Sequence, residues 1–132
     1  MKLEKLMSDN NKFQKHYPLE ISYSKKNKIL TVLFSNKEKF NLSSEYLRIS
    51  SPSAEVQTHN PQTRIFVPGK KYVDISNIEK VGNYAIRILF NDGHDTGIYS
   101  WEYLYELCTD FEKNWKTYIT EIEKRNLSRE LG

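Results

Sequence analysis

Short runs in which apolar and polar residues alternate dominate the first half of the chain. Apolar residues alternate with serines in "LEISYS" (19–24), which is typical of a half-buried strand. The run "ILTVLF" (29–34) follows after a lysine-rich turn at 25–28, so the two runs predict an antiparallel hairpin. "SNKEKFNL" (35–42) then predicts a polar turn and a short strand.

The same order of elements recurs later in the chain. Ser43 is placed to cap a helix "SEYLRI" (44–49) through its side-chain oxygen, and Ser100 is placed to cap a helix that ends at Cys108. Upstream of the second helix, "YAIRILF" and "DTGIY" predict two strands joined by the turn "NDGH". The similarity of "SSEYL" to "SWEYL" favours a duplicated β-β-α unit. The alternative is that hairpin-then-helix units simply share capping rules.

A long segment separates the two copies. "SPSAEVQTHNPQTRIFVPGKK" (51–71) is punctuated by prolines and predicts a functional or mobile loop. "YVDISNIEKV" (72–81) then leads through Gly82 and Asn83 into the next strand, which is a hairpin signal.

The C-terminal part of the chain predicts an amphipathic helix over 109–126. Thr109 and Glu112 fit a capping box at its start. An apolar stripe follows at helical spacing, formed by Phe111, Trp115, Tyr118 and Ile122. The stripe predicts packing across the sheet; the alternative is that it binds a partner.

These elements predict an α+β fold in two layers, with antiparallel β-hairpins and helices packed on one side. The 132 residues are the length of one domain. We expect a flexible N-terminal leader over 1–16, the domain itself over 17–108, and the helix 109–126 packed on that domain.

Charge and composition narrow the function classes. With 38% hydrophobic and 28% charged residues the composition is that of a soluble globular protein. The formal net charge of +3 is too weak to imply nucleic-acid binding. Lysines cluster at 25–28 and at 70–71 with Tyr72 close by, but no recognised RNA- or DNA-binding motif accompanies them, so nucleic acid is not expected as a partner.

Cysteine usage and the N-terminus indicate a cytoplasmic protein. Cys108 is the only cysteine, so the chain forms no internal disulfide and no cysteine-based zinc site; a small buried hydrophobe is the expected role. The first 18 residues carry charges throughout and contain no apolar signal core. No apolar run has the length of a transmembrane helix, so no membrane partner is expected.

Two blocks of the sequence resemble a known family. "LRISSPSAEVQTH" (47–59) and "IEKVGNYAIRILFNDGHDTGIYSWEYLYEL" (78–107) are similar to the gamma-butyrobetaine hydroxylase-like N-terminal domain family, formerly a domain of unknown function. The resemblance covers about residues 17–108 and implies a compact two-layer α+β domain. Such domains begin the carnitine-pathway dioxygenases, occur as a terminal module on some Mrp-type iron–sulfur carriers of plants, and stand alone in bacteria, which is the form this chain resembles.

The resemblance also implies a metal comparison. In the dioxygenases the domain holds zinc with three cysteines and one histidine. The cysteine positions correspond here to Ser51, Ser53 and Val56, and the histidine to His94. Serine hydroxyls are poor zinc ligands and valine is none. No cofactor is therefore expected, and zinc or iron remains the alternative.

His94 has three interpretations. As a metal ligand it would join His59, with oxygen from Glu55 or Asp92, although this spacing matches no known metal motif. As a proton-transfer group it would be oriented by Asp92 and Asp95. As a structural residue its ring would bond a backbone carbonyl or the loop that carries the two serines, and this interpretation is favoured.

The serines give little support for catalysis. Nucleophilic chemistry would need Ser51 or Ser53 beside a base such as His59 or His94. No nucleophile-elbow pattern surrounds either serine, and Ser, His and Asp are common on turns. No catalytic residue is therefore predicted.

The sequence favours a non-enzymatic accessory or binding module that presents loop 50–62 and turn 92–95 to an unknown protein partner. The resemblance suggests iron–sulfur carrier machinery or metal-centre maturation as its setting. The alternatives are a metal-binding protein that uses His94 and His59, and a small enzyme with a site centred on His94. The predicted surface consists of Ser51, Ser53, Glu55, His59, Asp92 and His94.

Overall fold

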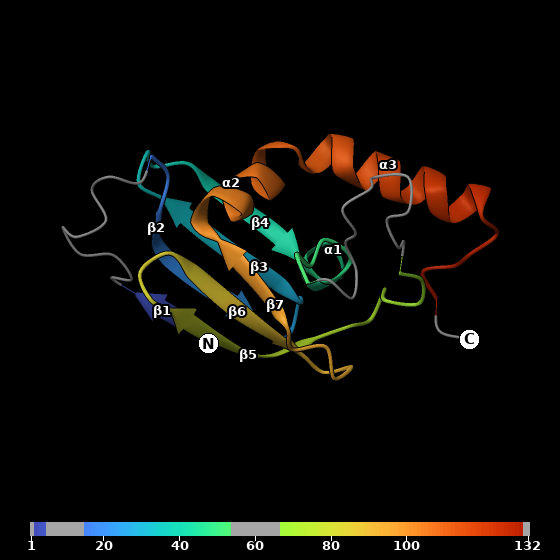
Figure 1. Cartoon of the computed structure of the whole chain (residues 1–132), viewed down its shortest axis with the longest axis horizontal. Helices are drawn as coiled ribbons and strands as arrows, with labels where there is room; N and C mark the ends of the chain where they lie inside the picture. Colours follow the sequence, from blue (N-terminus) through green and yellow to red (C-terminus); the bar gives the residue numbers. More distant parts are fainter. Residues whose placement is uncertain (1, 5–14, 54–66, 131–132) are drawn as a thin grey trace.

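The computed structural model describes residues 2–4, 15–53 and 67–130. Its elements, in chain order, are β1 (Lys2–Glu4), β2 (Pro18–Ser24), β3 (Ile29–Phe34), β4 (Lys39–Ser43), α1 (Ser44–Ile49), β5 (Ile75–Val81), β6 (Ala85–Phe90), β7 (Gly97–Ser100), α2 (Trp101–Thr109) and α3 (Phe111–Lys124). Strands β5–β7 lie in front of β2–β4, and α1, α2 and α3 gather along one side of the strands (Figure 1).

The strands form two antiparallel sheets. One sheet has the order β1-β2-β3-β4 and the other the order β5-β6-β7. Their buried faces belong to a single hydrophobic cluster. Across the sheets, the backbone N–H of Ile75 on β5 donates to the hydroxyl of Tyr23 on β2 at 3.2 Å. The α+β class, the antiparallel hairpins and the helices packed against them are confirmed.

The strand–turn–strand–helix unit occurs twice. Strands β3 and β4 lead into α1, and β6 and β7 lead into α2. Ser43 caps α1 by accepting a hydrogen bond from the Tyr46 N–H at 3.0 Å. Ser100 caps α2 in the same way, accepting from the Tyr103 N–H at 3.1 Å. Both predicted caps are therefore present, and each fixes the point at which a strand turns into a helix.

The structure describes the predicted leader and the predicted loop only near their ends. Lys2–Glu4, within the predicted leader, pair with β2 as the short strand β1, so these three residues are not a free leader. Residues 5–14 and 54–66 lie outside the described residues. The predicted hairpin at Gly82 and Asn83 is present between β5 and β6, and Gly82 adopts a positive φ of 52° there.

The core is aromatic as well as aliphatic. Trp101, at the start of α2, is fully buried, and its ring N–H donates to the Asn83 carbonyl at 2.7 Å. Cys108, near the end of α2, is buried in the same cluster. Burial raises the pKa of the Cys108 thiol to about 12, so this cysteine is a packing residue, as predicted.

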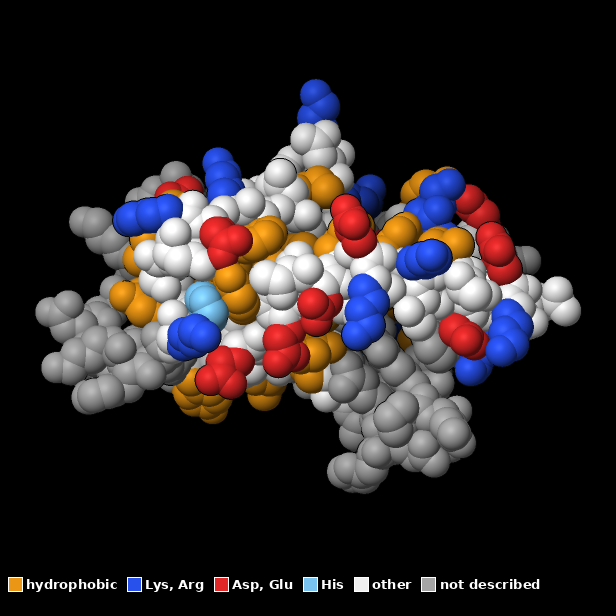
Figure 2. Space-filling view, turned by 90° about the horizontal axis from the view of Figure 1, so that it is seen from above, with side chains coloured by type: hydrophobic (Ala, Val, Ile, Leu, Met, Phe, Trp, Pro, Cys, Tyr) orange, Lys and Arg blue, Asp and Glu red, His pale blue; other side chains and the backbone are white. Residues whose placement is uncertain are grey.

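Helix α3 begins later than the sequence predicts, and the predicted capping box at its start is wrong. Thr109 belongs to α2, and its hydroxyl donates back to the carbonyls of Tyr105 and Glu106. Asp110 stands at the N-cap without a side-chain cap bond. Tyr118 and Ile122 are buried, whereas the outer surface of α3 carries charges of both signs (Figure 2). None of the described helices combines the length and apolarity needed to cross a membrane.

Candidate functional site

The end of α1 delivers two serines to the edge of the second sheet. Ser50 closes the helix, with its N–H donating to the Tyr46 carbonyl at 3.1 Å. The Ser50 carbonyl in turn accepts a hydrogen bond from the Tyr103 hydroxyl on α2. This contact anchors the chain just as it leaves the helix, and it places Ser51 and Ser53 against the segment 94–97.

Two side-chain hydrogen bonds join these serines to the turn before β7. The Ser51 hydroxyl lies 2.8 Å from Nε2 of His94, and both residues are buried, with exposed fractions of 0% and 5%. The Ser53 hydroxyl lies 2.7 Å from that of Thr96. His94 thus occupies the arrangement of the structural interpretation, in which its ring bonds the serine loop.

Gly97 makes this close approach achievable. A Cβ atom at Gly97 would lie 2.5 Å from the Ser51 hydroxyl oxygen and 3.2 Å from Cε1 of Tyr99. Glycine is therefore required by space rather than by backbone conformation at this position.

Tyr99 links β7 to α1 next to the two serines. Its side chain is fully buried, and its hydroxyl donates to the carbonyl of Leu47 on α1. Burial raises the pKa of the Tyr99 hydroxyl far above its ordinary value, although a hydrogen bond with Ser51 opposes this rise. The phenol therefore stays neutral, and its hydrogen bond to Leu47 joins β7 to α1.

Asp92 ties the turn to α1 and to the loop before β5. Its Oδ2 lies 2.9 Å from Nε of Arg48 and 2.7 Å from Nζ of Lys70. Its Oδ1 accepts a hydrogen bond from the His94 N–H at 3.1 Å. Burial acts to raise the pKa of this carboxyl, but the bonds from Lys70, His94 and Arg48 together outweigh it and lower the pKa to about 2.

This depressed pKa predicts an acid-sensitive contribution to stability. Because the folded-state pKa of about 2 lies below the ordinary 3.8, the contribution of Asp92 is present above about pH 4 and is lost as the pH falls through about 2. We expect Asp92→Asn to lower the free energy of unfolding by about 1 kcal/mol near neutral pH, a value reduced for solvent screening. Urea unfolding at a series of pH values measures this.

The variant should also lose the part of the acid sensitivity that Asp92 supplies. Asp95→Asn, which changes an exposed carboxyl on the same turn, is the matched control and should leave stability almost unchanged. If the two substitutions lowered the free energy of unfolding equally, the ion pairs of Asp92 would not be the source of its contribution to stability.

Of the predicted surface residues, the structure brings together Ser51, Ser53, Asp92 and His94. Glu55 and His59 lie outside the described residues, so the predicted metal pair of His94 with His59 stays a prediction. Within the described ranges, no group of three or more His, Cys, Asp or Glu side chains is placed to hold a metal ion.

Sequence reasoning missed three contributors to the site: Arg48, Lys70 and Thr96. Arg48 lies in the last turn of α1 and is 44 positions away from its partner Asp92. No local spacing signals such a pair, because it exists only once α1 and the turn are packed together. The bond of Thr96 with Ser53 spans 43 positions and has no local signal either, although Thr96 lies in the same turn as His94.

The fold and this hydrogen-bonded cluster define a class: a small α+β domain whose two repeated units are fastened to each other at the ends of α1 and β6. The chain belongs to the gamma-butyrobetaine hydroxylase-like N-terminal domain family, which matches it over residues 21–105. The resemblance that the sequence predicted is confirmed.

Solved structures support the same assignment. The chain is 39% identical to each of two structures solved by NMR in solution, with TM-scores of 0.75 and 0.74. The first alignment covers 87% of this chain and 90% of the other, and the second covers 94% and 91%. A crystal structure of a protein with unknown function from Acidithiobacillus ferrooxidans ATCC 23270, of the DUF971 family, is 34% identical, with a TM-score of 0.56 and coverage of 68% and 90%. The comparison with curated proteins found no match.

Proposed function

We propose that this protein is a non-enzymatic binding module that presents turn 92–95, together with loop 50–62, to a protein partner. The observation that carries this proposal is the buried contact between the Ser51 hydroxyl and Nε2 of His94. This pair has the separation that nucleophilic catalysis requires. Ser51, however, is 0% exposed, so a substrate atom has no access to the hydroxyl in this arrangement.

The surroundings of the pair support the same role. Nε2 of His94 is engaged by Ser51, so coordination of a metal through this atom would first have to break a buried hydrogen bond. Asp92 is engaged by Arg48 and Lys70. The polar groups that chemistry would use are instead holding the turn rigid against α1.

A rigid turn suits recognition. Asp95 and Thr96, which lead from the turn toward β7, are exposed, while His94 before them is buried. Because the turn is already ordered by hydrogen bonds, a partner would bind it without a large loss of conformational entropy. A preformed polar turn beside a loop is a common form of protein-binding surface.

Iron–sulfur carrier machinery or metal-centre maturation is the setting we propose for this partner. The support is family resemblance to modules on iron–sulfur carriers, which is an argument by analogy rather than from the site.

The test places a photo-crosslinking amino acid at Asp95 and, as the control, at Lys113 on the outer surface of α3. We expect one native partner to be captured from position 95 and not from position 113. The purified partner should then bind the unlabelled protein and lose affinity for Asp95→Lys. Equal capture from both positions, or a stoichiometric metal that disappears on His94→Ala, would overturn the proposal.

A further inference from the structure

A second surface feature lies beside the turn surface, and its binding role does not depend on the proposed function. A groove of about 440 Å³ runs between α3, the start of α1, the β2–β3 turn and the loop before β5. Three aromatic side chains line it, those of Tyr72, Phe111 and Trp115, and so do three cationic ones, those of Lys28, Lys71 and Arg129. This volume is in the range of sites that hold a small ligand or one or two peptide side chains.

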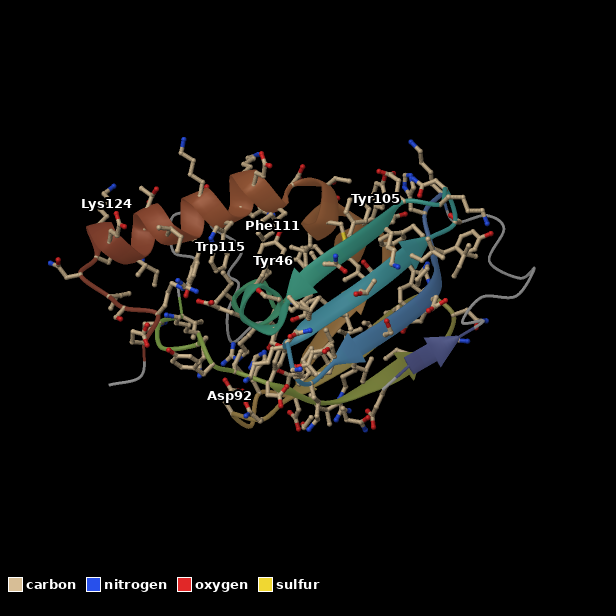
Figure 3. The ribbon with its side chains drawn as sticks, turned by 180° about the vertical axis from the view of Figure 1, so that it is seen from behind. Tyr46, Asp92, Tyr105, Phe111, Trp115 and Lys124 are labelled. Atoms are coloured by element: carbon tan, nitrogen blue, oxygen red, sulfur yellow. The ribbon has the colours of Figure 1, made fainter. Side chains whose placement is uncertain are left out.

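The aromatic wall comes from α3. Phe111 and Trp115 project from the helix toward Tyr46 of α1 (Figure 3), and their rings meet that of Tyr46 edge-on at 4.9 and 6.4 Å. Phe111 remains 37% exposed and Tyr72, on the opposite wall, is 54% exposed. Exposed aromatic side chains on both sides of one groove leave apolar area that a partner could cover.

The cationic rim joins two lysine clusters that are distant in the sequence. Lys28 comes from the turn at 25–28, and Lys71 from the pair at 70–71. The Lys28 carbonyl accepts hydrogen bonds from the N–H and the hydroxyl of Ser44, which fixes the backbone of Lys28 at the groove. No described acidic residue forms an ion pair with Lys28, so none of them competes with a ligand for its ammonium group.

Carboxylates neutralise this rim only in part. Glu45 is the one acidic side chain among those lining the groove in the described part of the chain, and it is buried and held by Arg129 through two bonds of 2.8 Å. Lys71 pairs with Glu130 at 2.8 Å, but both side chains are substantially exposed, and an exposed pair of this kind exchanges easily with a competing carboxylate.

The ring faces distinguish between two kinds of acidic partner. Single-stranded nucleic acids bind by stacking bases on open aromatic faces. The guanidinium of Arg129 lies 5.3 Å from the centre of the Trp115 ring, and Phe111 stacks near the same ring at 6.1 Å and 16°. Trp115 is covered in this way, and Nζ of Lys71 lies 5.5 Å from the centre of the Tyr72 ring, so neither ring offers a fully open face on which a base could stack.

We propose that this groove binds an acidic peptide segment of a partner protein, with an apolar side chain seated between Tyr72 and Phe111 and carboxylates at Lys28 and Lys71. Charge complementarity selects the partner, and the apolar anchor supplies most of the affinity. The groove is continuous with the proposed turn surface, because Tyr72 and Val73 also line a neighbouring hollow that contains Asp92.

The experiment uses the full chain and a short fluorescein-labelled peptide rich in Glu and Asp that carries one Phe and one Leu. Fluorescence anisotropy should show binding that weakens as salt is added, and a peptide with Lys in place of each acidic residue should not bind. We expect Lys28→Gln and Lys71→Gln each to weaken binding about fivefold, and Tyr72→Ser to weaken it about tenfold.

Matched controls are available for each change. Lys37, like Lys28, is a turn lysine with a positive φ (73° against 54°), and Lys37→Gln should bind normally. Tyr84 is as exposed as Tyr72, and Tyr84→Ser should also bind normally. Unchanged thermal unfolding shows that each variant is folded.

Three outcomes would overturn the proposal. The first is equal binding of the acidic and basic peptides. The second is an equal effect of the control and groove substitutions. The third is an oligothymidine that binds more tightly than the peptide and is displaced by the same groove substitutions, which would make the partner a nucleic acid. These results leave the crosslinking test at position 95 unaffected.

Discussion

Replacing Gly97 by alanine is expected to lower the free energy of unfolding by about 3 kcal/mol. The added Cβ would lie 2.5 Å from the Ser51 hydroxyl oxygen, which real Cβ atoms do not tolerate, so Ser51 must move. Its movement breaks the buried hydrogen bond with Nε2 of His94. The cost therefore combines overpacking with a buried polar group left unpaired. Urea unfolding followed by tryptophan fluorescence measures it.

A double-mutant cycle identifies the mechanism. In a Ser51→Ala background the hydroxyl oxygen is absent and the nearest atom of residue 51 is its Cβ, at 3.5 Å, so Gly97→Ala should cost clearly less there. Gly93→Ala is the control glycine. A Cβ at Gly93 has no atom within 4 Å, but φ is 89°, so its cost of about 1 kcal/mol should not depend on Ser51. A Gly97→Ala cost that is the same in both backgrounds would contradict the steric explanation.

Elements that depend on neighbouring residues were predictable from the sequence. The period-two alternation of β2 and β3 predicts strands because one face of each lies on the core. The cap at Ser43 places the start of α1, and the predicted helix 44–49 agrees with the observed one. In both cases the pattern is written within a few positions, so no knowledge of the packing is needed.

The failure at Thr109 has a local cause as well. A threonine followed three positions later by glutamate fits a capping box, but Thr109 instead continues α2, with its hydroxyl bonded to carbonyls of the preceding turn. Asp110 alone separates α2 from α3. When a single residue connects two helices, a residue beside it can either end the first helix or begin the second. The sequence pattern does not distinguish between these two possibilities.

The site was predictable only in part, because its contacts join residues of the two repeated units. Proximity of His94 to the serine loop was one of three interpretations of a single histidine, and the contact with Ser51 joins residues 43 positions apart. The pairing of Asp92 with Arg48 and Lys70 has no local signature at all. Such pairs follow from the packing of α1 against the β6–β7 turn, which propensity and spacing do not encode.

Replacing Arg129 by alanine is expected to lower the free energy of unfolding by about 3 kcal/mol, because it removes the partner of a buried carboxylate. Glu45 on α1 is 5% exposed, and Arg129 meets both of its oxygens at 2.8 Å. The hydroxyl of Tyr118 on α3 lies 3.3 Å from the same carboxylate and is too weak a partner to replace a cation. Without Arg129, the Glu45 carboxylate would have no cationic partner in a site shielded from water.

The loss should also release the C-terminal segment. Around Arg129, the Ser128 carbonyl accepts from the Gly69 N–H at 2.7 Å and the Arg129 carbonyl accepts from the Lys71 N–H at 3.0 Å. These backbone bonds hold the segment against the loop before β5 only while the side chain anchors it. Amide hydrogen exchange at Gly69 and Lys71 should therefore accelerate in Arg129→Ala, beyond the change that global destabilisation alone produces.

Arg125 provides the matched control, because it forms an exposed pair with Glu121 one helical turn away, at 3.1 Å. Removing this arginine should cost less than about 0.5 kcal/mol, since an exposed pair of this spacing gains little over solvated charges. In a Glu45→Gln background the cost of Arg129→Ala should fall, because a neutral amide does not require a cation. Two results would contradict this explanation: equal stability of the two arginine variants, or an undiminished cost of Arg129→Ala in the Glu45→Gln background. Either would mean that burial of the Glu45 charge does not make Arg129 important. The attachment of the C-terminal segment would then depend on its backbone bonds alone.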